Sequence, residues 1–169
     1  QTAPGMTITA RMIAAASRAR ALISEDARRA IAGFIERHAC PDGGYAGPGG
    51  VTDIYYSAFA LQSLLALEIA PPPGIVEYAA RFDVSGDLDL VHLACLIRVR
   101  SLLACAGDAM DVAARLGAFS TGGGFAMRPG ARASVYAAFL AISAYQDAAA
   151  EVPDAPAVLR SLQRLHSHD

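Results

Sequence analysis

A glycine-rich segment that leads into an apolar helix decides the expected fold. It reads Pro41-Asp42-Gly43-Gly44-Tyr45-Ala46-Gly47. Asp42 and the two glycines tolerate positive φ, and Tyr45 is expected to pack the turn onto the core. An aspartate, Asp53, then begins a helix that carries few charges after its start and is therefore expected to be buried on most sides.

The same pattern returns further along the chain. Gly122-Gly123-Gly124-Phe125 precedes an apolar helix that begins at Ser134. A weaker middle copy begins at Asp89, so successive starts lie 36 and 45 residues apart (89 − 53 and 134 − 89). Spacings of this size are typical of two-helix repeats.

Apolar periodicity and capping residues predict the other helices. Ser24 is a favourable N-cap, and Pro73 suits a first helical turn. No segment shows sustained period-2 alternation, so the fold is predicted to be all-α with about eight helices. The helices are predicted over residues 9–23, 24–38, 53–68, 73–81, 88–103, 108–116, 134–146 and 156–166, with a turn containing Ser85-Gly86 before the middle copy.

Composition limits the classes of protein. A length of 169 residues predicts one domain over residues 1–169. A formal charge of −2 argues against nucleic-acid binding. The hydrophobic fraction of 54% predicts nearly all-helical packing, a lined cavity or a face covered by a partner. No membrane span is predicted, because Gln62 and Glu68 interrupt the most apolar run and three prolines follow it.

The cysteines indicate the compartment. The chain has three cysteines, an odd number, and they lack the spacing of metal ligands: Cys40, Cys95 and Cys105. Reduced cysteines in a cytoplasmic protein are the expected state, and no cofactor or metal is expected.

The first glycine segment, the run Asp53-Ile54-Tyr55-Tyr56-Ser57 and the following Ala/Leu-rich helix resemble a known repeat. Protein prenyltransferase β subunits and squalene or oxidosqualene cyclases share it. Gly123-Gly124-Phe125 with residues 135–139 is a second match. The resemblance implies an α-α toroid, in which helix pairs form two rings around an apolar cavity that binds isoprenoids. A chain of about eight helices implies a reduced or partial toroid, and hence a homodimer or a heteromeric partner.

The chemistry of those families is not retained. The resemblance places a zinc-binding aspartate on Asp53, but the cysteine position is Tyr55 and the histidine position is Ala137. Neither side chain completes a zinc site. The acidic run Asp87-Leu88-Asp89-Leu90 lacks the last carboxylate of the cyclase motif, and the chain has no Trp. Zinc-thiolate and cyclase chemistry are therefore not expected.

Nine residues are candidates for ligand binding, each with a structural alternative. The aspartates either cap helices or contact a ligand. The tyrosines either line a cavity or pack in the core. The histidine is either a core residue with satisfied hydrogen bonds or a proton-transfer group. The arginines either hold a diphosphate, as basic residues do in the prenyltransferases, or lie in solvent or an interface. These residues are Asp53, Tyr55, Tyr56, Asp89, His92, Arg98, Arg128, Arg132 and Tyr136.

Three functions remain open. The first is a binding or accessory subunit whose apolar cavity or groove holds an isoprenoid-like or peptide ligand, and the loss of the zinc ligands favours it. The second is an active transferase that uses a prenyl diphosphate, with Arg98, Arg128 and Arg132 on the leaving group. The third is a structural subunit of a protein complex.

Overall fold

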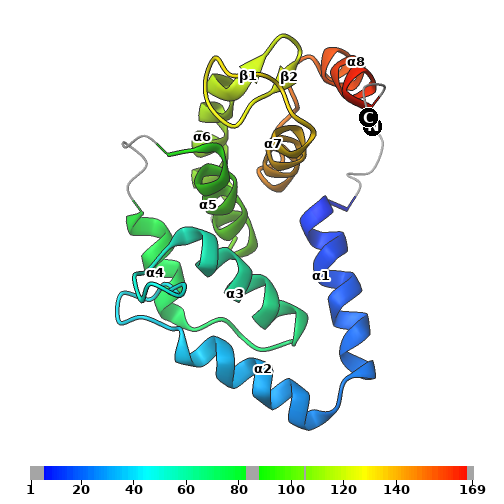
Figure 1. Ribbon diagram of the computed structural model, residues 1–169. Coiled ribbons are helices and arrows are strands. Elements are labelled where there is room, and N and C mark those ends of the chain that lie inside the picture. The colour runs from blue at the N-terminus through cyan, green and yellow to red at the C-terminus, as the bar shows by residue number, and fades with distance from the viewer. Residues whose placement is uncertain (1–5, 83–87, 105, 167–169) are drawn as a thin grey trace. The chain divides into compact units, whose positions relative to one another are not determined.

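A computed structural model describes residues 6–82, 88–104 and 106–166. The predicted turn at Ser85-Gly86, Asp87 and Cys105 lie outside the described residues. Eight α-helices, two short 3-10 helices and a two-stranded sheet make up these parts of the chain (Figure 1), so the all-α prediction is confirmed. Contacts cluster in two compact units, Gln1–Phe82 and Asp83–Asp169. The single-domain prediction over residues 1–169 stays a prediction.

The first unit contains four α-helices. Thr7 and Ser24 cap the first two by accepting a backbone N–H from the residue three positions on. The helix predicted over 9–23 is α-helical only to Ala19 and then tightens into a 3-10 turn. Helix α1 packs on α3. The bounds are α1 (Ile8–Ala19), η1 (Arg20–Leu22), α2 (Glu25–Arg37), α3 (Ile54–Ala66) and α4 (Pro73–Arg81).

The glycine turn between α2 and α3 is held by side chain and backbone together. Asp42 accepts hydrogen bonds from Gly44 N (3.2 Å) and Thr52 Oγ1 (3.0 Å). Tyr45 is 4% exposed, which confirms that it packs the turn onto the core. Its backbone N–H donates to Ser57 Oγ of α3 (2.9 Å). The turn therefore fixes the end of α2 against the first turn of α3.

The second unit also contains four α-helices among its described residues. Helix α5 packs along α7 and against α6. The helix predicted over 108–116 is α6 followed by a longer 3-10 segment, and a short antiparallel sheet takes the place of the first glycine turn. The bounds are α5 (Leu90–Leu102), α6 (Ala106–Ala113), η2 (Ala114–Phe119), β1 (Ser120–Thr121), β2 (Gly124–Phe125), α7 (Val135–Asp147) and α8 (Ala155–His166).

Helices α3, α5 and α7 have the same construction. Each is 13 residues long and begins after a side-chain N-cap, provided by Asp53, Asp89 or Ser134. Each ends with a residue of positive φ at the same distance from its cap, although none of these is glycine: Glu68 (59°), Ala104 (61°) and Ala149 (53°). The three starts predicted from the sequence are therefore the starts of three helices with the same length and a side-chain N-cap.

The burial of one face differs between these helices. The first, fifth and eighth positions after the cap are fully buried in α3 and α5, as Ile54, Ala58 and Leu61 and as Leu90, Ala94 and Ile97. In α7 the first and fifth positions, Val135 and Phe139, are exposed. None of the described helices is long and apolar enough to cross a bilayer.

Candidate functional site

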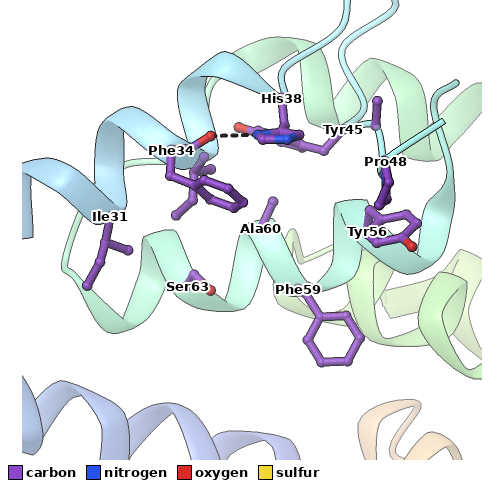
Figure 2. Close-up of a pocket in the computed structure, with 12 residues that line it drawn as sticks. Ile31, Phe34, His38, Tyr45, Pro48, Tyr56, Phe59, Ala60 and Ser63 are labelled. Carbon is purple, nitrogen blue, oxygen red and sulfur yellow. Dashed lines mark hydrogen bonds between the residues drawn. The ribbon is translucent and has the colours of Figure 1, made fainter. Parts of the chain in front are cut away.

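An apolar groove of about 460 Å³ lies between α2 and α3 in the first unit. The end of α2 forms one wall, the middle of α3 forms the other, and the glycine turn closes one end (Figure 2). No charged carboxylate or guanidinium group is among its lining residues. These are Ile31, Phe34, Ile35 and His38 of α2, Tyr45, Ala46, Gly47 and Pro48 of the turn, and Tyr56, Phe59, Ala60 and Ser63 of α3.

Several of the large apolar side chains around the groove are exposed. The exposed fraction is 40% for Ile31, 57% for Phe34 and 46% for Phe59. Single exposed apolar residues are ordinary on protein surfaces, but a contiguous set around a hollow marks a binding surface.

Several residues of the second unit that correspond to the lining of this groove are buried. The pairings Ala39–Tyr45 and Ser120–Phe125 align the two turns. On this alignment, three α2 positions of the groove, Ile31, Ile35 and His38, correspond to buried residues of the second unit. Three α3 positions, Tyr56, Ala60 and Ser63, correspond to buried alanines of α7. The buried residues are Val112, Leu116 and Phe119, and Ala137, Ala141 and Ala144. Phe34 corresponds to Arg115, which is only partly buried and, with Phe119, lines another hollow of the second unit. Among the described residues, the groove of the first unit is therefore only partly filled at the corresponding positions of the second unit.

Tyr56 occupies the end of the groove next to the turn. A Cβ atom built at Gly47 would lie 2.1 Å from its ring, so the ring lies directly against the glycine backbone. Only a residue without a side chain allows this approach. Tyr56 is thus the one predicted candidate that lines this groove.

His38 supplies polar chemistry at the same wall. Its Nδ1 lies 2.8 Å from the carbonyl oxygen of Phe34, one helical turn earlier. Because a carbonyl oxygen only accepts, Nδ1 donates in this bond, and Nε2 of the neutral ring is then an acceptor. The ring also lies against the Phe34 ring, with centroids 4.5 Å apart and the two planes tilted by 41°. His38 therefore offers a hydrogen-bond acceptor on a largely apolar surface, whose lining also includes the hydroxyl-bearing residues Tyr56 and Ser63.

Two smaller hollows adjoin the groove at Ser63. They measure about 190 and 230 Å³ and share Ser63 with it. One is lined by Met12, Ile13 and Ala16 of α1. The other reaches Leu67 beyond the end of α3. Together with the groove they follow α3 along most of its length.

The other two candidates of the first unit, Asp53 and Tyr55, have structural roles in helix capping and aromatic packing. Asp53 caps α3 by accepting the N–H of Tyr55 (2.8 Å), which confirms the capping interpretation. The Tyr55 ring is half-buried and meets Phe59 edge-on, with centroids 4.9 Å apart. The residue that corresponds to it in the second unit, Tyr136, is 54% exposed.

In the second unit, Asp89 caps α5 and binds His92. Its Oδ1 accepts the backbone N–H of His92 (2.9 Å) and lies 2.8 Å from Nδ1 of the same residue. Burial by itself would raise the pKa of Asp89, but the hydrogen bonds from His92 outweigh it, and the pKa is lowered. The carboxylate is therefore ionised at neutral pH.

The three predicted arginines do not converge. Arg98 is buried, and its Nε donates to Asp147 Oδ2 (3.2 Å). Arg128 is exposed and lines a second hollow, of about 610 Å³, together with Asp89 and Arg115. Arg132 is exposed and is not among the residues that line this hollow.

Sequence reasoning missed most of the groove and one arginine. Ile31 and Phe34 fall on the apolar side of an amphipathic helix, which normally indicates core. Arg115 lies on a 3-10 segment that was predicted as the end of a helix. No local signal separates a groove-lining apolar residue from a buried one.

No group of three His, Cys, Asp or Glu residues that could hold a metal ion is found among the described residues. Cys40 and Cys95 are free thiols. Searches of protein-family models, of curated proteins and of solved structures find no match to this chain.

Proposed function

We propose that the chain is a prenyltransferase-like binding or accessory protein that holds an apolar, isoprenoid-like chain in the groove between α2 and α3. The observation that carries the proposal is the set of exposed apolar side chains around this groove. A ligand that covers them removes apolar surface from water, which is the main favourable term in such binding. The volume lies within the usual range of small-molecule sites, about 300–1,000 Å³.

The form of the groove supports an elongated ligand. The hollows at Ser63 extend it from Tyr56 toward Leu67. At 1.5 Å per residue, this part of the chain spans about 16 Å. A flexible, branched hydrocarbon chain can follow such a surface, and Nε2 of His38 can accept a hydrogen bond from a terminal hydroxyl group.

The proposal also includes the architecture, a partial α-α toroid. Helices α3, α5 and α7 alternate with the helices that follow them, and this order is the one that a partial α-α toroid requires. The family's zinc positions here are a capping aspartate, Asp53, a tyrosine, Tyr55, and a buried alanine, Ala137. This residue set supports binding rather than thiolate chemistry.

The transferase alternative has less support. A diphosphate requires several cations at one rim. Arg98 is engaged with Asp147, and no arginine lines the apolar groove. The binding function therefore fits the groove better than prenyl transfer does.

Farnesol binding to the full chain, measured by isothermal titration calorimetry, tests the proposal. Full burial of a phenylalanine contributes about 1.5–3 kcal/mol, and Phe34 has roughly half of its surface to bury. Phe34→Ala should therefore weaken binding by about 0.8–1.5 kcal/mol, or roughly fourfold to twelvefold. Ala60→Phe should abolish binding by filling the groove.

Leu22→Ala is the matched control, because Leu22 is apolar, 86% exposed and not among the groove-lining residues. It should bind farnesol as the unaltered protein does. The proposal fails if the unaltered protein does not bind farnesol, or if Leu22→Ala and Phe34→Ala lose the same affinity.

A further inference from the structure

Helix α1 has a second apolar face besides the one that packs on α3. Its buried residue is Thr9, whereas Met12 is 50% exposed and Ala19 is exposed as well. Met12 and Ala19 are two turns apart and therefore lie on one side of the helix. The 3-10 turn η1 continues the same side, because residues three apart are eclipsed in a 3-10 helix and Leu22 follows Ala19 by three. Leu22 is 86% exposed and Ile23 is 37% exposed, and we name these four residues, Met12, Ala19, Leu22 and Ile23, the α1 stripe.

Two exposed arginines border the α1 stripe. Arg11 directly precedes Met12, and Arg18 directly precedes Ala19. Consecutive side chains of an α-helix point about 100° apart, so both arginines lie beside the stripe and on the same side of it. The stripe therefore combines exposed apolar side chains with a basic border.

The chain around the stripe carries no acidic side chain of its own. Residues 6–24 include three arginines and neither Asp nor Glu. The third of these, Arg20, pairs with Glu68 just after α3 (2.7 Å between Nη2 and Oε2), and this pair ties η1 to α3. An amphipathic segment that exposes apolar side chains next to arginines is typical of a helix that lies on the surface of an anionic membrane.

The stripe also borders the two hollows that extend the apolar groove. Met12 lines the hollow of about 190 Å³, and Ala19 and Ile23 line the hollow of about 230 Å³. Both hollows share Ser63 with the groove between α2 and α3. The stripe and the groove are therefore joined by apolar hollows within the first unit.

We propose that the α1 stripe and its two arginines dock on an anionic lipid bilayer. The exposed apolar side chains enter the boundary between headgroups and acyl chains and leave water, while Arg11 and Arg18 bind lipid phosphates. Docking places the hollows next to the bilayer, so that an apolar ligand reaches the groove without crossing water. This last step rests on the function proposed for the groove, whereas docking itself does not.

Co-sedimentation of the full chain with vesicles of phosphatidylcholine and phosphatidylglycerol in equal parts tests the docking surface. The protein should bind these vesicles, should bind vesicles of phosphatidylcholine alone much more weakly, and should leave the anionic vesicles as salt is added. The double variant Arg11→Gln, Arg18→Gln should lose about fivefold in affinity for each arginine, or roughly thirtyfold in all. Leu22→Ala should lose about tenfold, because most of the apolar side chain that enters the bilayer is removed.

A second double variant, Arg128→Gln with Arg132→Gln, is the matched control. It removes the same charge from two exposed arginines of the other unit, so it should bind anionic vesicles as the unaltered protein does. Farnesol titration without vesicles separates docking from ligand binding. Arg11→Gln with Arg18→Gln should keep the farnesol affinity of the unaltered protein, because neither arginine lines the groove. Absence of farnesol binding in the unaltered protein would remove the function proposed for the groove, but not the docking surface.

Three results would overturn the docking proposal: no binding to anionic vesicles, equal binding to neutral vesicles, or equal losses in the two double variants. Sedimentation velocity without lipid tests a second copy of the chain as the occupant of the stripe. A dimer that Leu22→Ala dissociates would assign the stripe to that second copy and would overturn docking on a bilayer as well.

Discussion

Gly43→Ala should lower the free energy of unfolding more than alanine at Gly50 or Gly123, the other two glycines of positive φ considered below. Gly43 has φ of +92°, and a Cβ atom there would lie 2.0 Å from the backbone oxygen of Gly74 at the start of α4. The left-handed conformation costs an L-residue about 1–2 kcal/mol. The overlap is with backbone, which cannot rotate away, and overpacking of this kind adds about 1–3 kcal/mol. The expected loss in the free energy of unfolding is about 2–5 kcal/mol.

Three other glycines separate the two contributions. Gly50 has φ of +71° and open space around its Cβ position, so alanine there should cost only the conformational part, about 1–2 kcal/mol. Gly123 has φ of +88°, and its nearest neighbour is Ala157 Cβ at 3.0 Å, so its cost should be intermediate. Gly49 has neither a positive φ nor a close neighbour, and Gly49→Ala should be neutral or slightly stabilising.

Urea denaturation followed by circular dichroism gives the free energies of unfolding, and hydrogen exchange over residues 73–81 shows whether α4 is the helix that is displaced. Faster exchange in α4 is expected for Gly43→Ala and not for Gly50→Ala. The reasoning is refuted if these two variants differ by less than about 0.5 kcal/mol, which is the usual range of a surface substitution.

Two further substitutions test the second unit. Asp147→Ala should lower the free energy of unfolding by about 3–5 kcal/mol, because it removes a carboxylate paired with the buried Arg98; a loss below 1 kcal/mol in urea denaturation would contradict this. Asp89→Ala should cost about 1 kcal/mol at neutral pH through loss of the cap. Because the pKa of Asp89 is lowered from 3.8 in the folded chain, its contribution is present above that value and is lost as pH falls through the folded pKa. The two stability curves should therefore converge in acid, and a constant difference across pH would contradict the assignment.

The helices were predictable because their signals are local. Capping residues and apolar periodicity located the starts of α3, α5 and α7 at Asp53, Asp89 and Ser134, and the structure confirms all three caps. The ends were less accurate: Glu68, Ala104 and Ala149 adopt positive φ without being glycine, so the usual stop signal is missing.

The sites were less predictable because they depend on contacts between distant residues. Arg98 looked like a cation available to a ligand, but Asp147 lies 49 residues further along the chain, and no local pattern shows the pairing. Phe34 lies on the apolar side of α2, as a core residue would, yet it is 57% exposed. Which apolar face is covered depends on the packing of a neighbouring helix, and the sequence of α2 does not contain that information.

The two units differ in side-chain size at one position next to the turn. In the second unit, α7 carries the small residues Ala137, Ala141 and Ala144, and α6 packs on it. In the first unit, α3 carries the large Tyr56 at the first of these positions, and its ring lies against Gly47 at the end of the turn. Ala60 and Ser63 of α3 are as small as their counterparts in α7, so the difference in size on this helix lies at Tyr56. The ring therefore closes the turn end of the groove, while the small residues further along α3 leave room for a ligand.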